Sequence, residues 1–271
     1  MKLFDSNGTT YTVVSTINKL QQVDSGFFDA QYIAHARMVG YPQNTMHLYE
    51  AALEKGYKIV ECDLEFTKDN IPVLLHDPTI NNVARNPDGS TLSETVSIED
   101  MTYEEALRYD FGIYAGAEFA GTPLTKLETL LRFCQRNNLL IVLDCGFDST
   151  QARYDALYDL VCKTGMRLKT LWSDGNYSYL SSIDKGLIYQ FGGGWNKSMI
   201  DAAATRLGNC GLIILSTSYG GGNISDLAEI VDYGHKAGMI MKVSTINDAD
   251  VAEQFWAIGT DLIITDTLVN T

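Results

Sequence analysis

The chain has 271 residues, of which 45% are hydrophobic, so it holds enough apolar material for a sizeable core, and its formal net charge is −14. This acidic balance and the lack of any basic run argue against a nucleic-acid partner and against an anionic membrane surface. No stretch reaches the roughly 18 apolar residues of a membrane span. Residues 1–14 also lack the apolar centre of a signal peptide. We expect a soluble protein without a transmembrane segment, cytoplasmic or a fragment of a larger exported protein. Oligomeric state is not indicated.

Cysteine usage predicts no disulfide framework. The cysteines are odd in number, scattered along the chain and without a C-x-x-C pair: Cys62, Cys134, Cys145, Cys162 and Cys210. Most of them lie within apolar runs, so we expect buried free thiols.

Residues 1–30 are polar and rich in turn-forming residues, and we interpret them as an N-terminal arm or lead-in. From residue 31 to residue 271, apolar strand-like runs alternate regularly with helical stretches. The predicted strands are Tyr32–His35, Lys58–Asp63, Leu139–Asp144, Lys169–Ser173, Gly186–Phe191, Gly211–Ser216, Met239–Thr245 and Asp261–Thr265.

Helices are predicted between these strands, each with a recognisable cap at one end. They are Thr45–Lys55, Lys126–Asn137, Gln151–Lys163, Ile224–Ala237 and Asp248–Ile258. Eight strands alternating with helices favour one closed parallel (β/α)8 TIM barrel, an α/β fold that uses about 250 residues. A doubly wound sheet is disfavoured, because the glycine-rich phosphate loop expected after its first strand is missing.

The stretch 57–77 combines a structural signal with a chemical one. Glu61 and Asp63 are two residues apart on a predicted strand, so both carboxylates share one face. The turn signal at residues 67–70 leaves no room for a helical crossover, so the following apolar run is predicted to fold back as a hairpin. That hairpin would bring His76, which Asp77 follows, over the two carboxylates.

Residues 78–123 break the regular alternation. They are polar and mostly irregular, with one predicted helix at Tyr103–Tyr109. Long segments of this kind in compact domains are usually functional, so we expect a small insertion that covers the face of the hairpin. Two other histidines, His47 and His235, lie on predicted helices and are expected at the surface.

Active sites of (β/α)8 barrels lie at the carboxyl ends of the strands. Five predicted residues there carry chemistry: His35, Glu61, Asp63, His76 and Asp144. Three carboxylates without cysteine or histidine at ligand spacing predict one divalent cation, Mg²⁺ or Ca²⁺ rather than Zn²⁺. The two histidines suit general acid and base roles in transfer at phosphorus. Each residue alone is more often structural, and it is their convergence that favours a site.

Several short motifs follow one another in a recognisable order. They are I-A-H at 33–35, P-Q-N-T at 42–45, E-C-D-L-E-F-T-K-D-N-I-P-V-L-L-H-D at 61–77, L-E-T-L-L at 127–131, T-I-N-D at 245–248 and D-L-I-I-T-D at 261–266. From about Tyr32 to the C-terminus the chain thereby resembles the glycerophosphodiester phosphodiesterases. The resemblance implies a TIM barrel with a small insertion after the hairpin. It implies a divalent cation on Glu61 and Asp63, with Asp144 as third carboxylate.

The resemblance also implies a mechanism, in which His35 and His76 form the acid/base pair. A substrate hydroxyl next to the phosphodiester attacks phosphorus and expels the alcohol, and water then opens the cyclic phosphate. The family acts in lipid metabolism on small-molecule phosphodiesters, which are therefore the expected substrates.

The chain departs from the family pattern at its phosphate contacts. The family reads H-R-G where this chain has His35-Ala36-Arg37, and P-E-N where it has Gln43. Its third carboxylate belongs to an E-x-K pair, but here Gly146 stands at the lysine position. Charge-assisted contacts of this kind contribute roughly 1.5–3 kcal/mol each. Their loss predicts a lower turnover or a different substrate.

Three residues are predicted to bind the substrate: Arg37 and Lys242, as substitutes for the missing cations, and Asn44. Lys242 alternates along its strand with Ser244, so the two share a face. Adjacent residues at a strand end normally point to opposite faces, which weighs against Arg37.

We therefore expect a phosphoric diester hydrolase that depends on a metal and cleaves a glycerophosphodiester-like substrate to an alcohol and a phosphomonoester. The alternative is a weakly active or non-catalytic barrel that binds a polyol phosphate or glycopolymer as a module of a larger protein. A third reading, a sugar-phosphate isomerase or lyase, uses the same carboxylates but does not explain His76 and Asp77 on a hairpin arm.

Overall fold

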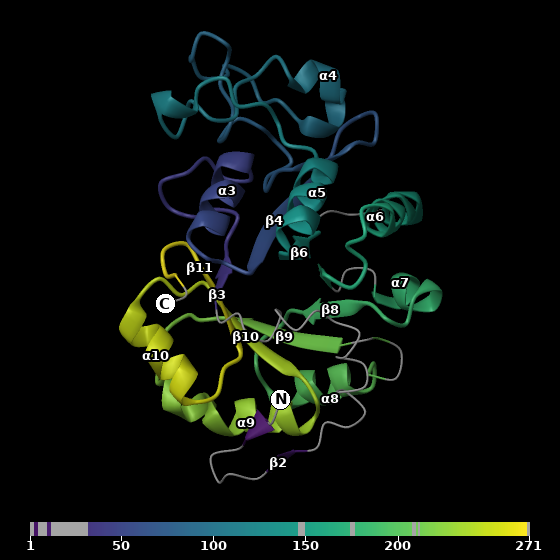
Figure 1. Ribbon diagram of the computed structural model, residues 1–271, viewed down its shortest axis with the longest axis vertical. Helices are drawn as coiled ribbons and strands as arrows, with labels where there is room; N and C mark the ends of the chain where they lie inside the picture. The colour runs from purple at the N-terminus through teal and green to yellow at the C-terminus, as the bar shows by residue number, and fades with distance from the viewer. Residues whose placement is uncertain are drawn as a thin grey trace. The chain divides into compact units, whose positions relative to one another are not determined.

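The computed structural model describes residues 3–4, 10–11, 32–145, 150–173, 177–207, 210 and 212–269. The chain divides into two compact units, one of Ala34–Arg167 and one of Leu168–Thr271 with Met1–Ile33. They are called unit 34–167 and unit 168–271 below, and Figure 1 labels their elements. How the chain divides into an arm over residues 1–30 and a barrel domain over residues 31–271 stays a prediction.

The hairpin predicted from the stretch 57–77 is confirmed. Strand β4 (Ile59–Phe66) pairs antiparallel with β5 (Pro72–Leu74), and Leu64 lies opposite Leu74. The turn between them is stabilised by Thr67, whose hydroxyl accepts a hydrogen bond from Ile71 N at 3.0 Å. On its other edge β4 pairs in parallel with β6 (Leu140–Asp144). Strand β4 is therefore the centre of unit 34–167 and is buried along its whole length.

Three helices of unit 34–167 follow the predicted pattern: α3 (Met46–Glu54), α5 (Leu127–Asn137) and α6 (Gln151–Lys163). In α5 the apolar positions recur three and four residues apart, so one stripe of the helix is buried against β5 and β6. The helix ends at Asn138, which adopts the left-handed conformation (φ +55°) common at helix C-termini. Figure 1 shows α3 and α5 beside β4.

The insertion, residues 78–123, is mostly irregular as predicted but has its own apolar core. Ile80, Ile98, Ala106 and Phe111 pack together and against Val73 of β5. The predicted helix over residues 103–109 is shorter than expected, since α4 spans only Tyr103–Ala106. Two short 3₁₀ turns, η1 (Ile98–Asp100) and η2 (Ala117–Phe119), complete the insertion.

The centre of unit 168–271 is a parallel sheet in which each strand pairs with the next strand along the chain. Its strands are β7 (Thr170–Ser173), β8 (Ile188–Phe191), β9 (Leu212–Ser218), β10 (Ile240–Ser244) and β11 (Leu262–Thr265). Its helices are α7 (Tyr177–Ile183), α8 (Lys197–Ala204), α9 (Ala228–Lys236), which the 3₁₀ turn η4 (Ile224–Leu227) precedes, and α10 (Ala249–Ala257). Helices α8 and α9 pack side by side against β9 and β10 (Figure 1).

All eight predicted strands are present. With β3 (Tyr32–Ala34), β4 and β6, the five parallel strands β7 to β11 give the strand–helix alternation of a (β/α)8 barrel. Helices α7 and α8 were not predicted, because both are short and α7 is rich in serine, which weakens the helical pattern. In the predicted arm, β1 (Leu3–Phe4) pairs antiparallel with β2 (Thr10–Tyr11), and its other residues lie outside the described ones.

All five cysteines are described and are free thiols, and four of them are buried. Within the described part of the chain, no helix combines the length and apolar character that crossing a membrane requires.

The prediction that His235 lies at the surface is wrong, although His47 is exposed as expected. Only 13% of the His235 side chain is exposed, and its Nε2 lies 2.8 Å from Asp261 Oδ2. Burial disfavours the charged imidazolium, but the hydrogen bond and charge of Asp261 outweigh it. The pKa of His235 is therefore raised above its ordinary value.

This pair makes the stability of the fold depend on pH. Because the folded pKa of His235 is raised, its contribution is complete below the ordinary pKa of about 6.5 and is lost as pH rises through the folded value. His235→Gln should lower the free energy of unfolding by about 1–3 kcal/mol at pH 6 and by less at pH 9. Urea unfolding at both pH values measures this, with His47→Gln as the control. An equal loss at the two pH values would contradict the assignment.

Candidate active site

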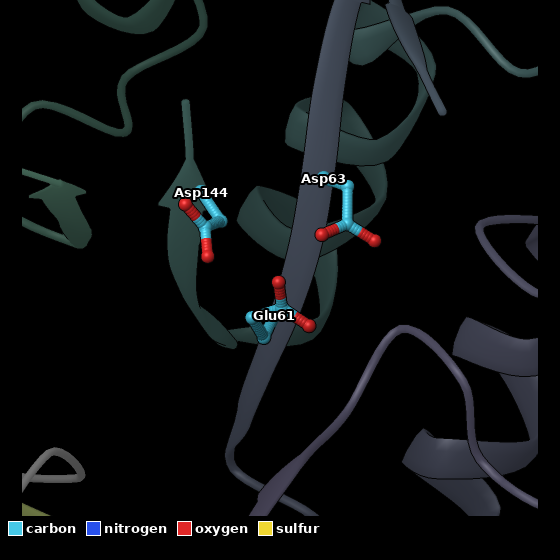
Figure 2. Close-up of side chains that lie close together, drawn as sticks. All are labelled: Glu61, Asp63 and Asp144. Atoms are coloured by element: carbon cyan, nitrogen blue, oxygen red, sulfur yellow. The ribbon is translucent and has the colours of Figure 1, made fainter. Parts of the chain in front are cut away.

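Three carboxylates meet where β4 and β6 run side by side. Glu61 and Asp63 lie on the same face of β4, and the register places Asp144, the last residue of β6, directly beside Asp63. Figure 2 shows the three side chains extending from the same side of the two strands. One carboxylate oxygen from each lies within 4.8 Å of the others. The structure therefore brings together the three residues predicted to hold a cation.

The donor set fits a hard divalent cation. All three side chains offer oxygen, which Mg²⁺ and Ca²⁺ prefer, and oxygens that bind one Ca²⁺ at about 2.4 Å lie up to about 4.8 Å apart. Burial raises the pKa of Asp63, and the neighbouring Asp144 adds to this, although the hydrogen bond from Asn44 and the charges of His76 and His35 lower it. Ionised Asp63 is therefore unfavourable in the folded protein, and a bound cation would relieve this cost.

The segment after β3 lies next to Glu61. Ala36 N donates to Glu61 Oε2 at 2.8 Å, and His35 Nε2 lies 4.0 Å from the same oxygen. Ala36 is fully buried, whereas 22% of the His35 side chain is exposed. The backbone thus fixes the Glu61 carboxylate from one side and leaves His35 partly open to a ligand.

Asn44 fixes Asp63 from the other side. The Asn44 Nδ2 donates to Asp63 Oδ2 at 2.8 Å, and its Oδ1 accepts from Asp63 N at 3.1 Å. Asn44 is buried and adopts the left-handed conformation (φ +57°), which asparagine tolerates better than most residues. Tyr49 of α3 adds a 3.3 Å hydrogen bond to Asn44 Oδ1. That Asn44 also binds substrate stays a prediction.

His76 follows the hairpin arm, and 44% of its side chain is exposed. Its Nδ1 lies 2.6 Å from Asp77 Oδ1. A protonated His76 would lower the pKa of Asp63, so the imidazole lies within electrostatic reach of that carboxylate. His76 and Asn44 line a small pocket together with two residues of the insertion, Val83 and Phe111. The insertion therefore contributes to this pocket, and that it covers the site stays a prediction.

The two predicted cations differ in their surroundings. Arg37 is exposed, and its charge contributes to lowering the pKa of Asp77. Lys242 belongs to unit 168–271, where it is buried on β10 and donates a hydrogen bond to Gln190 of β8. Substrate binding by Arg37 and by Lys242 stays a prediction.

Comparison with known proteins identifies the family. The model of the glycerophosphoryl diester phosphodiesterase family matches residues 38–187, which is more than half of the chain. The chain belongs to this family. It is thereby assigned to the phosphoric diester hydrolases, and the resemblance inferred from its motifs is confirmed.

Individual family members agree with this assignment. A glycerophosphodiester phosphodiesterase from Caldanaerobacter subterraneus is 25% identical over 84% of this chain and 91% of that protein. A Bacillus subtilis relative is 34% identical, but the match covers only 41% of this chain and 43% of the relative. An Oleispira antarctica phosphodiesterase, solved with the product sn-glycerol-3-phosphate, has a TM-score of 0.72 at 20% identity and covers 87% of this chain and 92% of that one. The chain has the TIM-barrel fold of these phosphodiesterases, as predicted.

Some groups in the site were not found by sequence reasoning. The amide of Ala36 holds Glu61, but any residue other than proline supplies such a donor, so the sequence carries no signal for it. Tyr49 of α3 contacts Asn44, and Asn82 of the insertion contacts Asp77, and neither contact follows from strand or helix spacing alone. Through Asp77, the second of these contacts reaches His76, a predicted catalytic histidine.

Proposed function

We propose that the protein hydrolyses a glycerophosphodiester-like substrate to an alcohol and a phosphomonoester, with a divalent cation and histidine acid/base catalysis. One observation carries the proposal. Within unit 34–167, the three-carboxylate cluster lies 4.0 Å from His35 and within electrostatic reach of His76. Hard-cation ligands and two titratable imidazoles are the groups that phosphodiester cleavage needs.

The two histidines would move the protons of the reaction. One accepts the proton of a substrate hydroxyl as its oxygen bonds to phosphorus, and the other donates a proton to the alcohol oxygen as its bond to phosphorus breaks. In the second step the roles reverse, and water opens the cyclic phosphate to the phosphomonoester. Glu61, Asp63 and Asp144 would hold a cation that, when bound, neutralises charge on the phosphoryl oxygens.

The substrate class is supported by relatives of this chain. The Oleispira antarctica phosphodiesterase was solved with sn-glycerol-3-phosphate as its product, and the Caldanaerobacter relative is named for glycerophosphodiesters. In this chain Ala36 stands where the family has an arginine, and it is fully buried, so no cation occupies that position. Arg37 and Lys242 are proposed to contact the substrate instead, and Asn44 is a third proposed contact.

The experiment is release of alcohol from a panel of glycerophosphodiesters and bis(p-nitrophenyl) phosphate. Each substrate is incubated with Mg²⁺, with Ca²⁺ or with EDTA. We expect turnover with at least one metal and none in EDTA. Without a cation on the carboxylate cluster, the negative charge of the phosphate is not neutralised. Equal rates in EDTA and in metal would contradict the proposal.

The buried Ala36 also favours the alternative of a weakly active or non-catalytic barrel that binds a polyol phosphate. A metal titration together with the variant His76→Ala separates the two. Measurable turnover that the variant loses while it still binds metal rules out the binding module. Metal binding without turnover on any substrate favours it.

A further inference from the structure

The side chain of Asp77 joins His76 to the insertion. Its Oδ1 lies 2.6 Å from His76 Nδ1, and its Oδ2 accepts a hydrogen bond from Asn82 Nδ2 at 2.9 Å. The hydrogen bonds with His76 and Asn82, and then the charge of Arg37, lower the pKa of Asp77. The carboxylate is therefore ionised at neutral pH and can only accept. His76 must then carry a proton on Nδ1 for this contact to form.

Asn82 emerges from a stretch that is fixed on both sides. The neighbouring Asn81 donates to Glu94 O at 2.6 Å and accepts from Val96 N at 2.9 Å. Ile80 and Val83 are buried in the apolar core of the insertion. The backbone that carries Asn82 is thus held in place, and its amide reaches Asp77 from a defined position.

This support matters because the pair that it holds is open to solvent. In this pair, 44% of the His76 side chain and 40% of the Asp77 side chain are exposed. A hydrogen bond between two such groups holds one geometry weakly when water can replace either partner. With Asn82 on its second oxygen, Asp77 loses the freedom to turn away from the imidazole.

We propose that Asn82 is a positioning residue for His76. It fixes the Asp77 carboxylate, which in turn fixes the orientation of the ring and keeps the proton on Nδ1. The Nε2 atom is then the nitrogen that exchanges a proton with the substrate or leaving alcohol. The kinetic consequence rests on the proposed function, but the arrangement of the three side chains does not.

The direct test is the tautomer of His76, read by long-range ¹⁵N–¹H NMR of protein labelled with ¹⁵N-histidine. Only four histidines are present, and His76→Gln identifies the signals of His76. In the wild type at alkaline pH, we expect the proton on Nδ1. Asn82→Asp keeps the side-chain shape but removes the donor and adds a charge beside Asp77, and Asn82→Ala removes the contact. Both should move the proton toward Nε2.

Asn86→Ala is the matched control, because Asn86 is another insertion asparagine whose side chain bonds to Ser90 and Thr91. It should leave the His76 signals unchanged. Unchanged His76 signals in both Asn82 variants, or an Nε2 proton in the wild type, would overturn the inference.

Kinetics give a second readout that a merely structural role would not move in the same way. Both Asn82 variants should lower kcat by roughly three- to tenfold and leave KM within about twofold. If the wild type shows the Nδ1 proton and the variants lose it, the inference stands even when no substrate is turned over, and only the proposed function fails. A fall in kcat with an unchanged tautomer would overturn the positioning role.

Discussion

Asp63→Asn is expected to abolish tight binding of Mg²⁺ and Ca²⁺ and to lower kcat by about 10³-fold or more. The substitution removes one of the three negative charges that lie within 4.8 Å of one another on β4 and β6. A cation that neutralises phosphoryl charge contributes several kcal/mol to the transition state, which corresponds to this loss in rate. Isothermal titration with each metal and the phosphodiesterase assay measure the two effects.

Without metal, in EDTA, Asp63→Asn should not destabilise the folded protein. Burial raises the pKa of Asp63, so its ionised form destabilises the folded protein at neutral pH when no cation is bound. The neutral asparagine avoids this cost, and its amide oxygen can accept the hydrogen bond from Asn44. We therefore expect the melting temperature in EDTA to be equal to that of the wild type or higher. The rise in melting temperature that the wild type shows on adding metal should be absent.

Glu65→Gln is the matched control for this prediction. Glu65 lies on the same face of β4, two residues beyond Asp63, and burial raises its pKa to about 7. It is not among the clustered carboxylates, so its neutralisation should leave metal affinity within about threefold. Loss of metal binding in Glu65→Gln, or its retention in Asp63→Asn, would show that the ligands have been wrongly assigned.

The stretch 57–77 illustrates why the metal cluster could be predicted from the sequence. Alternation along β4 puts Glu61 and Asp63 on one face, and parallel pairing puts the end of β6 beside the end of β4. The short turn then determines the hairpin. These rules depend only on local spacing and strand order, so no long-range contact had to be known.

Other features depend on contacts that local spacing does not determine. His235 stands among polar residues near a helix end, and only the fold places Asp261 against it. Asn82 reaches Asp77 because the core of the insertion fixes the loop between them. The helices α7 and α8 are short, so their formation depends on packing more than on helix propensity. In each case the contact or helix depends on tertiary packing, which local sequence spacing does not determine.

His35→Ala and His76→Ala are each expected to lower kcat on glycerophosphodiesters by about 10²–10⁴-fold, the range that positioned acid/base groups supply. Metal affinity should stay within about threefold, because neither imidazole belongs to the carboxylate cluster. The phosphodiesterase assay and metal titration are run on both variants, with His47→Ala as an exposed-histidine control. A rate loss below tenfold in either variant would contradict its catalytic role.

Substrates with different leaving groups assign the two roles. p-Nitrophenol leaves as a stable anion and needs no proton, so the variant that lacks the general acid should recover most of its rate on a glycerophosphodiester whose leaving group is p-nitrophenol. The variant that lacks the general base should stay slow on both substrates, since its nucleophile still has to be deprotonated. His35 and His76 occupy different surroundings, one beside Glu61 and one bound to Asp77. If both variants respond alike to the leaving group, the division into one acid and one base is wrong.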